Sequence, residues 1–179
     1  MINSSIDKKV LDKARNIKAL LFDVDGVLTD GSLTYSGNTE EYKTFNVKDG
    51  QIIKHLKENG IVVGAITGRS SVAVNRRCEE LKLDFFEQGV SDKYALIDQK
   101  LKTFNLKWDD VCYIGDDIID LKALKAAQLS ACPMDALEYI KTEVDYICMK
   151  DGGKGVVREL ADIILQAQNK LEKVINSYL

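Results

Sequence analysis

Apolar runs of strand length alternate with amphipathic segments along most of the chain. Runs bounded by Gly, Asp or Asn predict buried strands, and apolar residues spaced by three and four predict helices. The expected strands are 19–22, 61–66, 85–86, 111–114, 129–132 and 144–148. The expected helices are 1–16, 49–59, 72–82, 92–101, 121–127, 135–142 and 155–179. This alternation predicts an α/β fold with an open parallel sheet flanked by helices.

The segment after the first strand departs from that alternation. Leu33 and Tyr35 alternate with polar residues, residues 36–38 read Ser-Gly-Asn, and 42–47 is a second β-rich run. Two such runs around a turn predict a β-hairpin insertion at 31–47. Asp49 would cap the helix that follows. The length of the chain, 1–179, predicts a single domain.

Composition narrows the range of functions. The chain has 25 Lys and Arg against 28 Asp and Glu, which gives no reason to expect nucleic-acid or membrane binding. No apolar run approaches the roughly 20 residues of a membrane span, and the first 16 residues lack the apolar core of a signal peptide. We therefore expect a cytoplasmic protein. Its four scattered cysteines predict buried free thiols rather than a zinc site.

Acidic and hydroxyl side chains follow three of the expected strands. Asp23 and Asp25 end the first, Thr67 follows the second, and Asp116-Asp117 follows the run at 111–114. Ligands bind beyond the carboxyl ends of the strands in open α/β sheets, so these residues are expected to meet. Clustered carboxylates repel unless a cation compensates them. Oxygen ligands favour a hard cation, and the sequence predicts a Mg²⁺ site.

Further polar residues complete the candidate site. Asp120 adds another carboxylate, the amides of Gly68 and Arg69 precede a helix, and Lys93 lies near the start of the next. Together with Mg²⁺, these groups suit phosphoryl transfer through an aspartyl phosphate. Each residue alone also fits a structural role. Thr67 and the Asp116-Asp117 pair fit ordinary helix caps, and Lys93 fits a solvated helix face.

In chain order, four motifs resemble those of phosphatases in the haloacid dehalogenase superfamily. They are Asp23-Val-Asp25-Gly-Val, Thr67-Gly-Arg69, Lys93, and Gly115-Asp116-Asp117-x-x-Asp120. The resemblance covers about 17–169. Further segments resemble those of one small branch of this superfamily, which lacks a large cap domain and acts on sugar-acid phosphates. These segments are the hairpin, residues 45–50, the helix around 76–78 and the Gly-Gly-Lys-Gly loop at 152–155.

This resemblance implies a role for each motif residue. Asp23 would be the nucleophile, and Asp25 would protonate the leaving oxygen and then deprotonate water. Asp23, the backbone carbonyl of Asp25, and Asp116 would hold Mg²⁺, with Asp117 and Asp120 orienting them. Thr67 and Lys93 would hold phosphoryl oxygens.

The resemblance also implies a larger substrate-binding set. Its members are Asp25, Asn46, Val47, Lys48, Asp49, Gly50, Lys54, Gly68, Arg69, Arg77, Lys93 and Lys154. Arg69 and Arg77 suit a sugar carboxylate, because guanidinium binds carboxylates bidentately. Residue type alone equally favours Arg77 and Lys54 on a solvated surface and Asp49 as a cap.

The implied reaction is Mg²⁺-dependent hydrolysis of 3-deoxy-D-manno-octulosonate 8-phosphate, a small-molecule sugar-acid phosphate of lipopolysaccharide biosynthesis. Arg69 favours this substrate over the rival, a nonulosonate 9-phosphate. A receiver-type signalling domain would lack an Asp two residues after the phosphorylated one, so Asp25 argues against it. A non-catalytic assembly module is the remaining alternative. The branch also implies a homotetramer in which hairpins pair, since an exposed hairpin edge is a pairing template.

Overall fold

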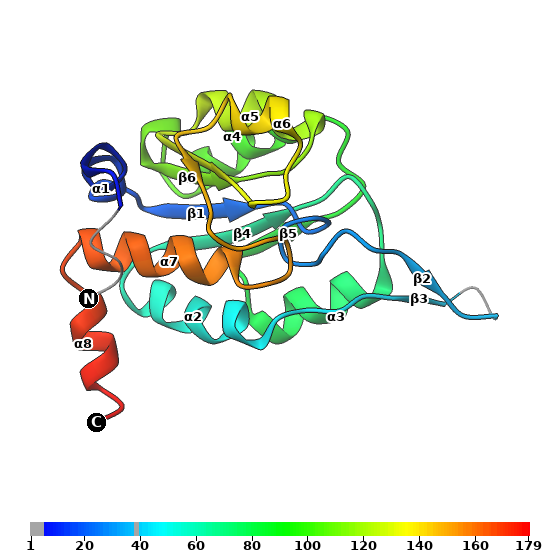
Figure 1. Cartoon of the computed structure of the whole chain (residues 1–179), viewed down its shortest axis with the longest axis horizontal. Coiled ribbons are helices and arrows are strands. Elements are labelled where there is room, and N and C mark those ends of the chain that lie inside the picture. The colour runs from blue at the N-terminus through cyan, green and yellow to red at the C-terminus, as the bar shows by residue number, and fades with distance from the viewer. Residues whose placement is uncertain (1–5, 38–39) are drawn as a thin grey trace.

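The computed structural model describes residues 6–37 and 40–179, and its core is a six-stranded parallel sheet. The strand order is β5-β4-β1-β6-β7-β8 (Figure 1). The strands are β1 (Ala19–Phe22), β4 (Val62–Ile66), β5 (Phe85–Glu87), β6 (Val111–Ile114), β7 (Leu129–Cys132) and β8 (Tyr146–Ile147). Every pair in this sheet is parallel, which confirms the predicted fold class.

Helices cover both faces of the sheet (Figure 1). They are α1 (Lys8–Ala14), α2 (Val47–Glu58), α3 (Val72–Leu81), α4 (Lys93–Thr103), α5 (Leu121–Ala126), α6 (Glu138–Lys141), α7 (Val156–Ala167) and α8 (Leu171–Asn176). Two 3₁₀ turns, η1 (Trp108–Asp110) and η2 (Ile118–Asp120), adjoin β6. Side chains of β1 alternate between the two sides: Leu20 packs with α2 and α7, whereas Leu21 packs with α4 and α5.

The register of β1 places its end beside those of its neighbours. Phe22 lies opposite Ala65 of β4 and Ile114 of β6. The next residue continues this arrangement, because Asp23 N donates to Ile114 O at 3.0 Å. The loops after β1, β4 and β6 therefore leave the sheet side by side, as the sequence predicted.

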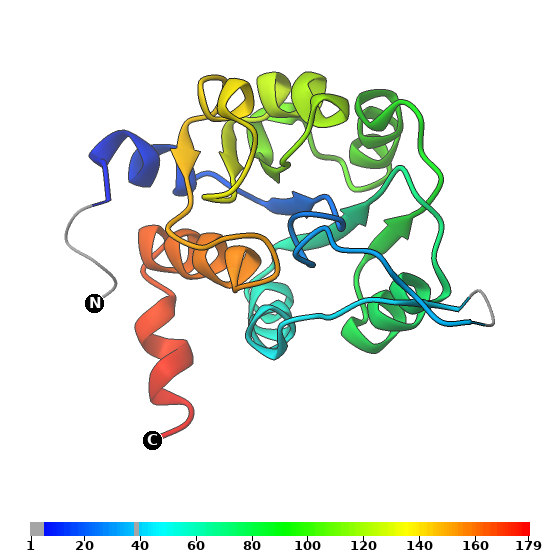
Figure 2. The same ribbon diagram turned by 45° about the vertical axis from the view of Figure 1, so that its right-hand side comes forward.

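The hairpin exists but is shorter than expected. Strands β2 (Thr34–Tyr35) and β3 (Glu41–Tyr42) pair antiparallel and project from the body of the molecule (Figure 2). The predicted second strand at 42–47 is wrong except at Tyr42, because β3 ends there and α2 begins at Val47. Asn46 Oδ1 accepts from Lys48 N at 2.9 Å and caps α2, so Val47 begins a helix and Asp49 lies inside it. Position 38 of the predicted turn lies outside the described residues.

Two further helix predictions need correction. The single C-terminal helix at 155–179 is instead α7 and α8, separated by Asn169 in the left-handed region at φ 57°. Gln168 Nε2 donates to Ile17 O at 2.8 Å and fixes the end of α7. The helix expected at 135–142 shrinks to α6, because the backbone of Leu137 is extended at ψ 141° and no helix continues through it.

The four cysteines match the prediction of buried free thiols. Cys78, Cys112, Cys132 and Cys148 are buried and unbonded to one another. Burial raises the pKa of each thiol, which keeps it protonated and unreactive. Within 6–37 and 40–179, no helix has the length and apolar character needed to cross a bilayer. The N-terminal helix expected at 1–16 is α1, and residues 1–5 lie outside the described part.

Candidate active site

The loop after β1 carries Asp23 and Asp25 to the carboxyl edge of the sheet. Val24 O accepts from the amides of Leu28 and Thr29 at 2.9 and 3.0 Å, which closes a compact turn around Gly26. Gly26 has φ +83°, and a Cβ there would lie 2.0 Å from Asp116 Oδ2. Only glycine lets this loop approach the loop after β6 so closely.

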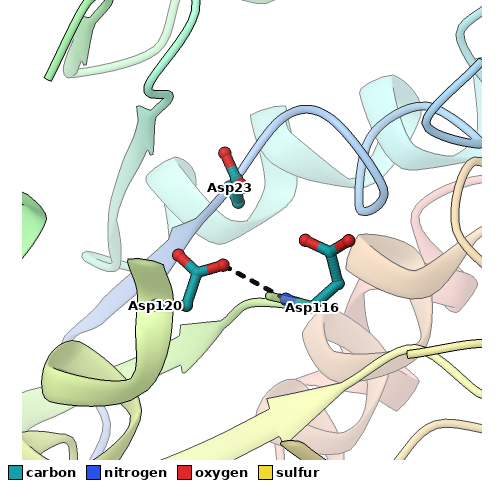
Figure 3. Close-up of side chains that lie close together, drawn as sticks. All are labelled: Asp23, Asp116 and Asp120. Atoms are coloured by element: carbon teal, nitrogen blue, oxygen red, sulfur yellow. Dashed lines mark hydrogen bonds between the residues drawn. The ribbon is translucent and has the colours of Figure 1, made fainter. Parts of the chain in front are cut away.

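Asp23, Asp116 and Asp120 form an acidic cluster at this edge (Figure 3). One carboxylate oxygen of each lies within 4.8 Å of the others. Burial, with the nearby Asp120 charge, raises the pKa of Asp23 to about 7. Burial and the Asp23 charge raise the pKa of Asp116 to about 8. The cluster holds more negative charge than its own protein partners compensate.

Asp120 differs from the other two because its oxygens are already occupied. Asp120 Oδ1 accepts from Lys93 Nζ at 2.7 Å and from Tyr113 OH at 2.6 Å. Its Oδ2 accepts from the amides of Asp116 and Asp117 at 3.2 and 3.4 Å. By contrast, Asp116 Oδ1 is buried and has no hydrogen-bond partner among the residues that the structure describes. Asp120 therefore positions its neighbours, whereas Asp116 has an oxygen free for a cation.

Lys93 provides the buried positive charge of the site. Its side chain is 1% exposed, and Nζ lies 2.9 Å from Asp23 Oδ2 and 2.7 Å from Asp120 Oδ1. Burial alone would lower the pKa of Lys93, but the paired carboxylates raise it, so the side chain stays charged. A solvated helix face, the alternative at this position, is therefore wrong. Asp92 Oδ1 caps α4 by accepting from Ala95 N and places Lys93 at its first position.

A cleft of about 250 Å³ opens over these groups. Its lining residues are Asp23, Asp25, Gly26, Gly31, Thr67, Gly68, Arg69, Asp116, Asp117 and Ile119. Thr67 Oγ1 lies 3.5 Å from Asp25 Oδ2 and accepts from Arg69 N at 3.3 Å. Asp117 Oδ1 accepts from Ile118 N at 2.6 Å and caps η2, so its structural role holds.

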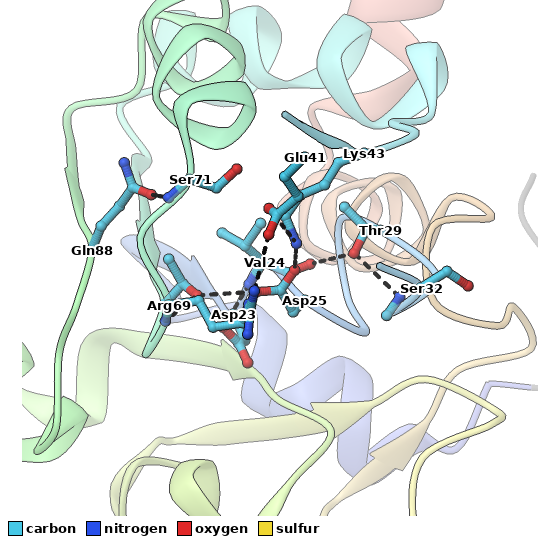
Figure 4. A network of polar contacts seen from close by, with 12 residues as sticks. Asp23, Val24, Asp25, Thr29, Ser32, Glu41, Lys43, Arg69, Ser71 and Gln88 are labelled. Atoms are coloured by element: carbon cyan, nitrogen blue, oxygen red, sulfur yellow. Dashed lines mark hydrogen bonds and ion pairs between the residues drawn. The ribbon is translucent and has the colours of Figure 1, made fainter. Parts of the chain in front are cut away.

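The hairpin brings two residues that sequence reasoning missed. Lys43 Nζ donates to Asp25 Oδ1, and Glu41 Oε2 accepts from Arg69 Nη2 at 2.9 Å (Figure 4). Tyr35 OH also accepts from that guanidinium at 3.4 Å. The alternation of an extended chain puts positions 41 and 43 on one side. That signal was present in the sequence, although nothing in it showed which loop the hairpin would face.

Other expected substrate residues gather between α2 and α3. Arg77 Nη2 donates to Asn46 O at 3.4 Å, and its guanidinium lies 5.8 Å from the Phe45 ring centre. A Cβ at Gly50 would lie 2.6 Å from Arg77 Nη2, so this glycine makes room for the arginine. Asn46 Nδ2 in turn donates to Gly153 O at 3.4 Å.

The remaining expected residues lie farther from the cleft. Val47 is exposed, and Lys54 is 71% exposed beside Glu58. Lys48 and Lys154 line a separate hollow of about 310 Å³ at the start of α7. Among the described residues that line the cleft, none comes from 46–54, Arg77 or Lys154.

Asp49 is a cap, but for a different helix from the one predicted. It is fully buried in the first turn of α2, and its Oδ1 accepts from Arg158 N of α7 at 2.8 Å. Gly155, the N-cap residue of α7, has no side chain to do this. Within 6–37 and 40–179, Asp49 Oδ2 has no hydrogen-bond partner, and burial raises the pKa of the carboxyl to about 6.

The chain belongs to the haloacid dehalogenase-like hydrolases, whose family model matches residues 33–128. It is 42% identical to the 3-deoxy-D-manno-octulosonate 8-phosphate phosphatase KdsC of Haemophilus influenzae, over 88% of each chain. KdsC of Escherichia coli K12 is 38% identical over 94% of this chain and 89% of its own.

Solved structures give the same picture. The Moraxella catarrhalis phosphatase of that name, crystallised with a magnesium ion, a phosphate ion and a KDO molecule, is 38% identical. Its TM-score is 0.93 over 96% of this chain and 98% of that one. The cobalt-bound Haemophilus influenzae enzyme is 42% identical, with a TM-score of 0.85 over 89% and 93%. The resemblance drawn from the motifs is therefore confirmed.

Proposed function

We propose that this chain is a Mg²⁺-dependent phosphatase that hydrolyses 3-deoxy-D-manno-octulosonate 8-phosphate (Kdo 8-phosphate) to Kdo and phosphate, in lipopolysaccharide precursor synthesis. The observation that carries the proposal is the meeting of Asp23, Asp25 and Thr67 in one cleft over Lys93 and Asp116. The relatives that share 38–42% identity with this chain carry that activity in their names.

In the first step, a carboxylate oxygen of Asp23 attacks phosphorus while the bond from phosphorus to the sugar oxygen breaks. Asp25 donates a proton to the departing sugar oxygen, which leaves as an alcohol. In the second step, water attacks the aspartyl phosphate and Asp25 takes its proton, releasing phosphate and restoring Asp23. Thr67 Oγ1 lies 3.5 Å from Asp25 Oδ2. The general acid Asp25 therefore faces the same space as Thr67, which would hold a phosphoryl oxygen.

The acidic cluster fits the divalent cation that this reaction needs. Asp23, the backbone carbonyl of Asp25, and Asp116 would hold Mg²⁺, and the unpartnered Asp116 Oδ1 supports this assignment. Asp120 would orient those ligands, because it accepts from the Asp116 amide and from Lys93, and Asp117 would support it by capping the η2 turn that carries Asp120. Bound Mg²⁺ supplies positive charge that offsets the phosphoryl oxygens. Lys93 would add a further positive charge, and its pairing with Asp120 fixes where that charge lies.

Two groups of residues would recognise the sugar acid. Arg69, in the cleft, would bind its carboxylate, and the Gly68 amide lies beside it. The second group lies outside the cleft of one chain: Asn46, Val47, Lys48, Asp49, Gly50, Lys54, Arg77 and Lys154. We propose a cytoplasmic homotetramer in which a neighbouring subunit closes each site, so that part of this group reaches substrate across the boundary.

Phosphate release from Kdo 8-phosphate and from a nonulosonate 9-phosphate, each with and without Mg²⁺, tests the proposal. We expect turnover of both to require Mg²⁺ and kcat/KM to be at least about tenfold higher for the eight-carbon acid. A preference for the nine-carbon acid would contradict the substrate assignment. An unchanged rate after removal of divalent cations would contradict the mechanism.

A further inference from the structure

The hairpin places two opposite charges against two residues of the cleft. Lys43 Nζ donates to Asp25 Oδ1, while Glu41 Oε2 accepts from Arg69 Nη2 (Figure 4). Lys43 Nζ also lies 3.4 Å from Glu41 Oε1. The four side chains therefore form an ion-pair network of alternating charge, which runs from the loop after β1 to the loop after β4.

The side chain of Lys43 is held firmly in this ion-pair network. Its side chain is 0% exposed, although it directly follows β3 of the projecting hairpin. A buried ammonium is costly unless it is paired and hydrogen-bonded, and Asp25 and Glu41 provide its carboxylates. The lysine consequently has little freedom to leave Asp25.

The two oxygens of Asp25 have different surroundings. Oδ1 accepts from Lys43. Oδ2 lies 3.5 Å from Thr67 Oγ1 and 3.9 Å from Arg69 Nε, both of which line the cleft. With Oδ1 occupied on the hairpin side, the carboxyl group presents Oδ2 to the cleft.

We propose that Lys43 is a positioning residue that fixes Asp25 so that Oδ2 exchanges the proton with the leaving oxygen. The hairpin thereby takes part in catalysis by orienting the acid. This inference rests on the proposed function, because only that reaction gives Asp25 a proton to deliver.

The dependence on the leaving group separates this role from a structural one. Departure of a primary alcohol needs the proton from Asp25, whereas dinitrophenolate departs without protonation. The value of kcat/KM reports the steps up to departure of the leaving group. It therefore isolates proton donation by Asp25 from the later activation of water. The substrates are Kdo 8-phosphate, a second primary alkyl phosphate, and 2,4-dinitrophenyl phosphate.

For Lys43→Met we expect kcat/KM to fall at least about tenfold for both alkyl phosphates and to change less than about threefold for the dinitrophenyl ester. Lys43→Arg keeps the charge and should recover part of the loss. Lys102→Met removes an exposed lysine and should leave all three values unchanged. Circular dichroism checks that each variant is folded.

Equal losses for alkyl and aryl phosphates, or no loss at all, would overturn the role of Lys43. Wild-type activity toward the second alkyl phosphate but not Kdo 8-phosphate would contradict the proposed substrate, and the Lys43 comparison would then rest on that alkyl phosphate. Release of phosphate from none of the three would contradict both proposals.

Discussion

At the scale of single residues, the site buries several carboxylates close together, which disfavours their charged forms. Neighbouring strands bring Asp23 and Asp116 together, and burial, with the repulsion between carboxylates, raises the pKa of both. Sequence reasoning found these two residues because Asp is depleted inside strands and favoured where strands end, so each marks the end of an apolar run. It could not foresee Lys43, whose partner lies 18 positions away on another loop.

Asp23→Asn should abolish turnover, with a loss of at least about a thousandfold in kcat, because an amide cannot attack phosphorus. The variant should remain folded, since it removes one charge from a repulsive cluster. Phosphate release and thermal unfolding measure the two effects. Asp109→Asn is the matched control, because that carboxylate is exposed beside Lys107. Retained activity in Asp23→Asn would contradict the assignment of the nucleophile.

Asp49 should make stability depend on pH. Its folded pKa of about 6 lies above its usual value of 3.8, so the stability that the protonated form contributes is present at low pH and lost as pH rises through about 6. Asp49→Asn keeps the acceptor for Arg158 N but does not ionise. The free energy of unfolding of wild type relative to this variant should fall by about 2 kcal/mol between pH 4 and 7.

Urea unfolding of both proteins across that range measures the difference. If the difference stays constant with pH, the carboxyl of Asp49 does not have the raised pKa that its burial predicts.

At the scale of elements, local sequence signals located most helices and strands but not all their ends. Asn46 and Asp49 both suit a cap, and only the fold shows that Asn46 caps α2 while Asp49 caps α7. The break at Asn169 also depends on tertiary contacts, since Gln168 Nε2 donates to Ala14 O, at the end of α1, and to Ile17 O, just after it. Periodicity alone therefore overextended the last helix.

The hairpin is the element on which assembly should depend. Leu33, just before β2, is 42% exposed, and Tyr42, in β3, is 55% exposed, although both side chains are largely apolar. In the proposed homotetramer these side chains would be covered by a neighbouring hairpin. Light scattering of wild type should give about four times the 20.0 kDa chain mass.

Leu33→Lys with Tyr42→Lys should shift that mass toward a single chain, because like charges would face one another. Ile147→Lys, on the exposed edge strand β8, is the matched control and should keep the wild-type mass. A wild-type mass equal to one chain at all concentrations would remove the tetramer.

At the scale of the whole molecule, the parallel sheet makes the site by bringing three loops to one edge. This convergence could be predicted from strand order rules without knowing any contact. The position of Arg77, Lys48 and Lys154 could not, because helix packing and loop closure set it. Their distance from the cleft is consistent with a site completed by a second chain.

Mg²⁺ should stabilise the whole fold, because it binds the native acidic cluster and not the unfolded chain. At about 100 times the Kd, the stabilisation should be about 2.7 kcal/mol, seen as a rise in Tm. Asp116→Asn should abolish most of that rise, whereas Asp109→Asn should retain it. A Tm shift that is equal in wild type and Asp116→Asn would place the cation elsewhere.

The most direct test of the mechanism is mass spectrometry of the Asp25→Asn variant, quenched in acid during reaction with 2,4-dinitrophenyl phosphate. Without Asp25 to activate water, the covalent intermediate should accumulate. We predict one phosphoryl group on the peptide that contains Asp23, and none when Asp23→Asn is added. A phosphoryl group on any other residue would contradict the account.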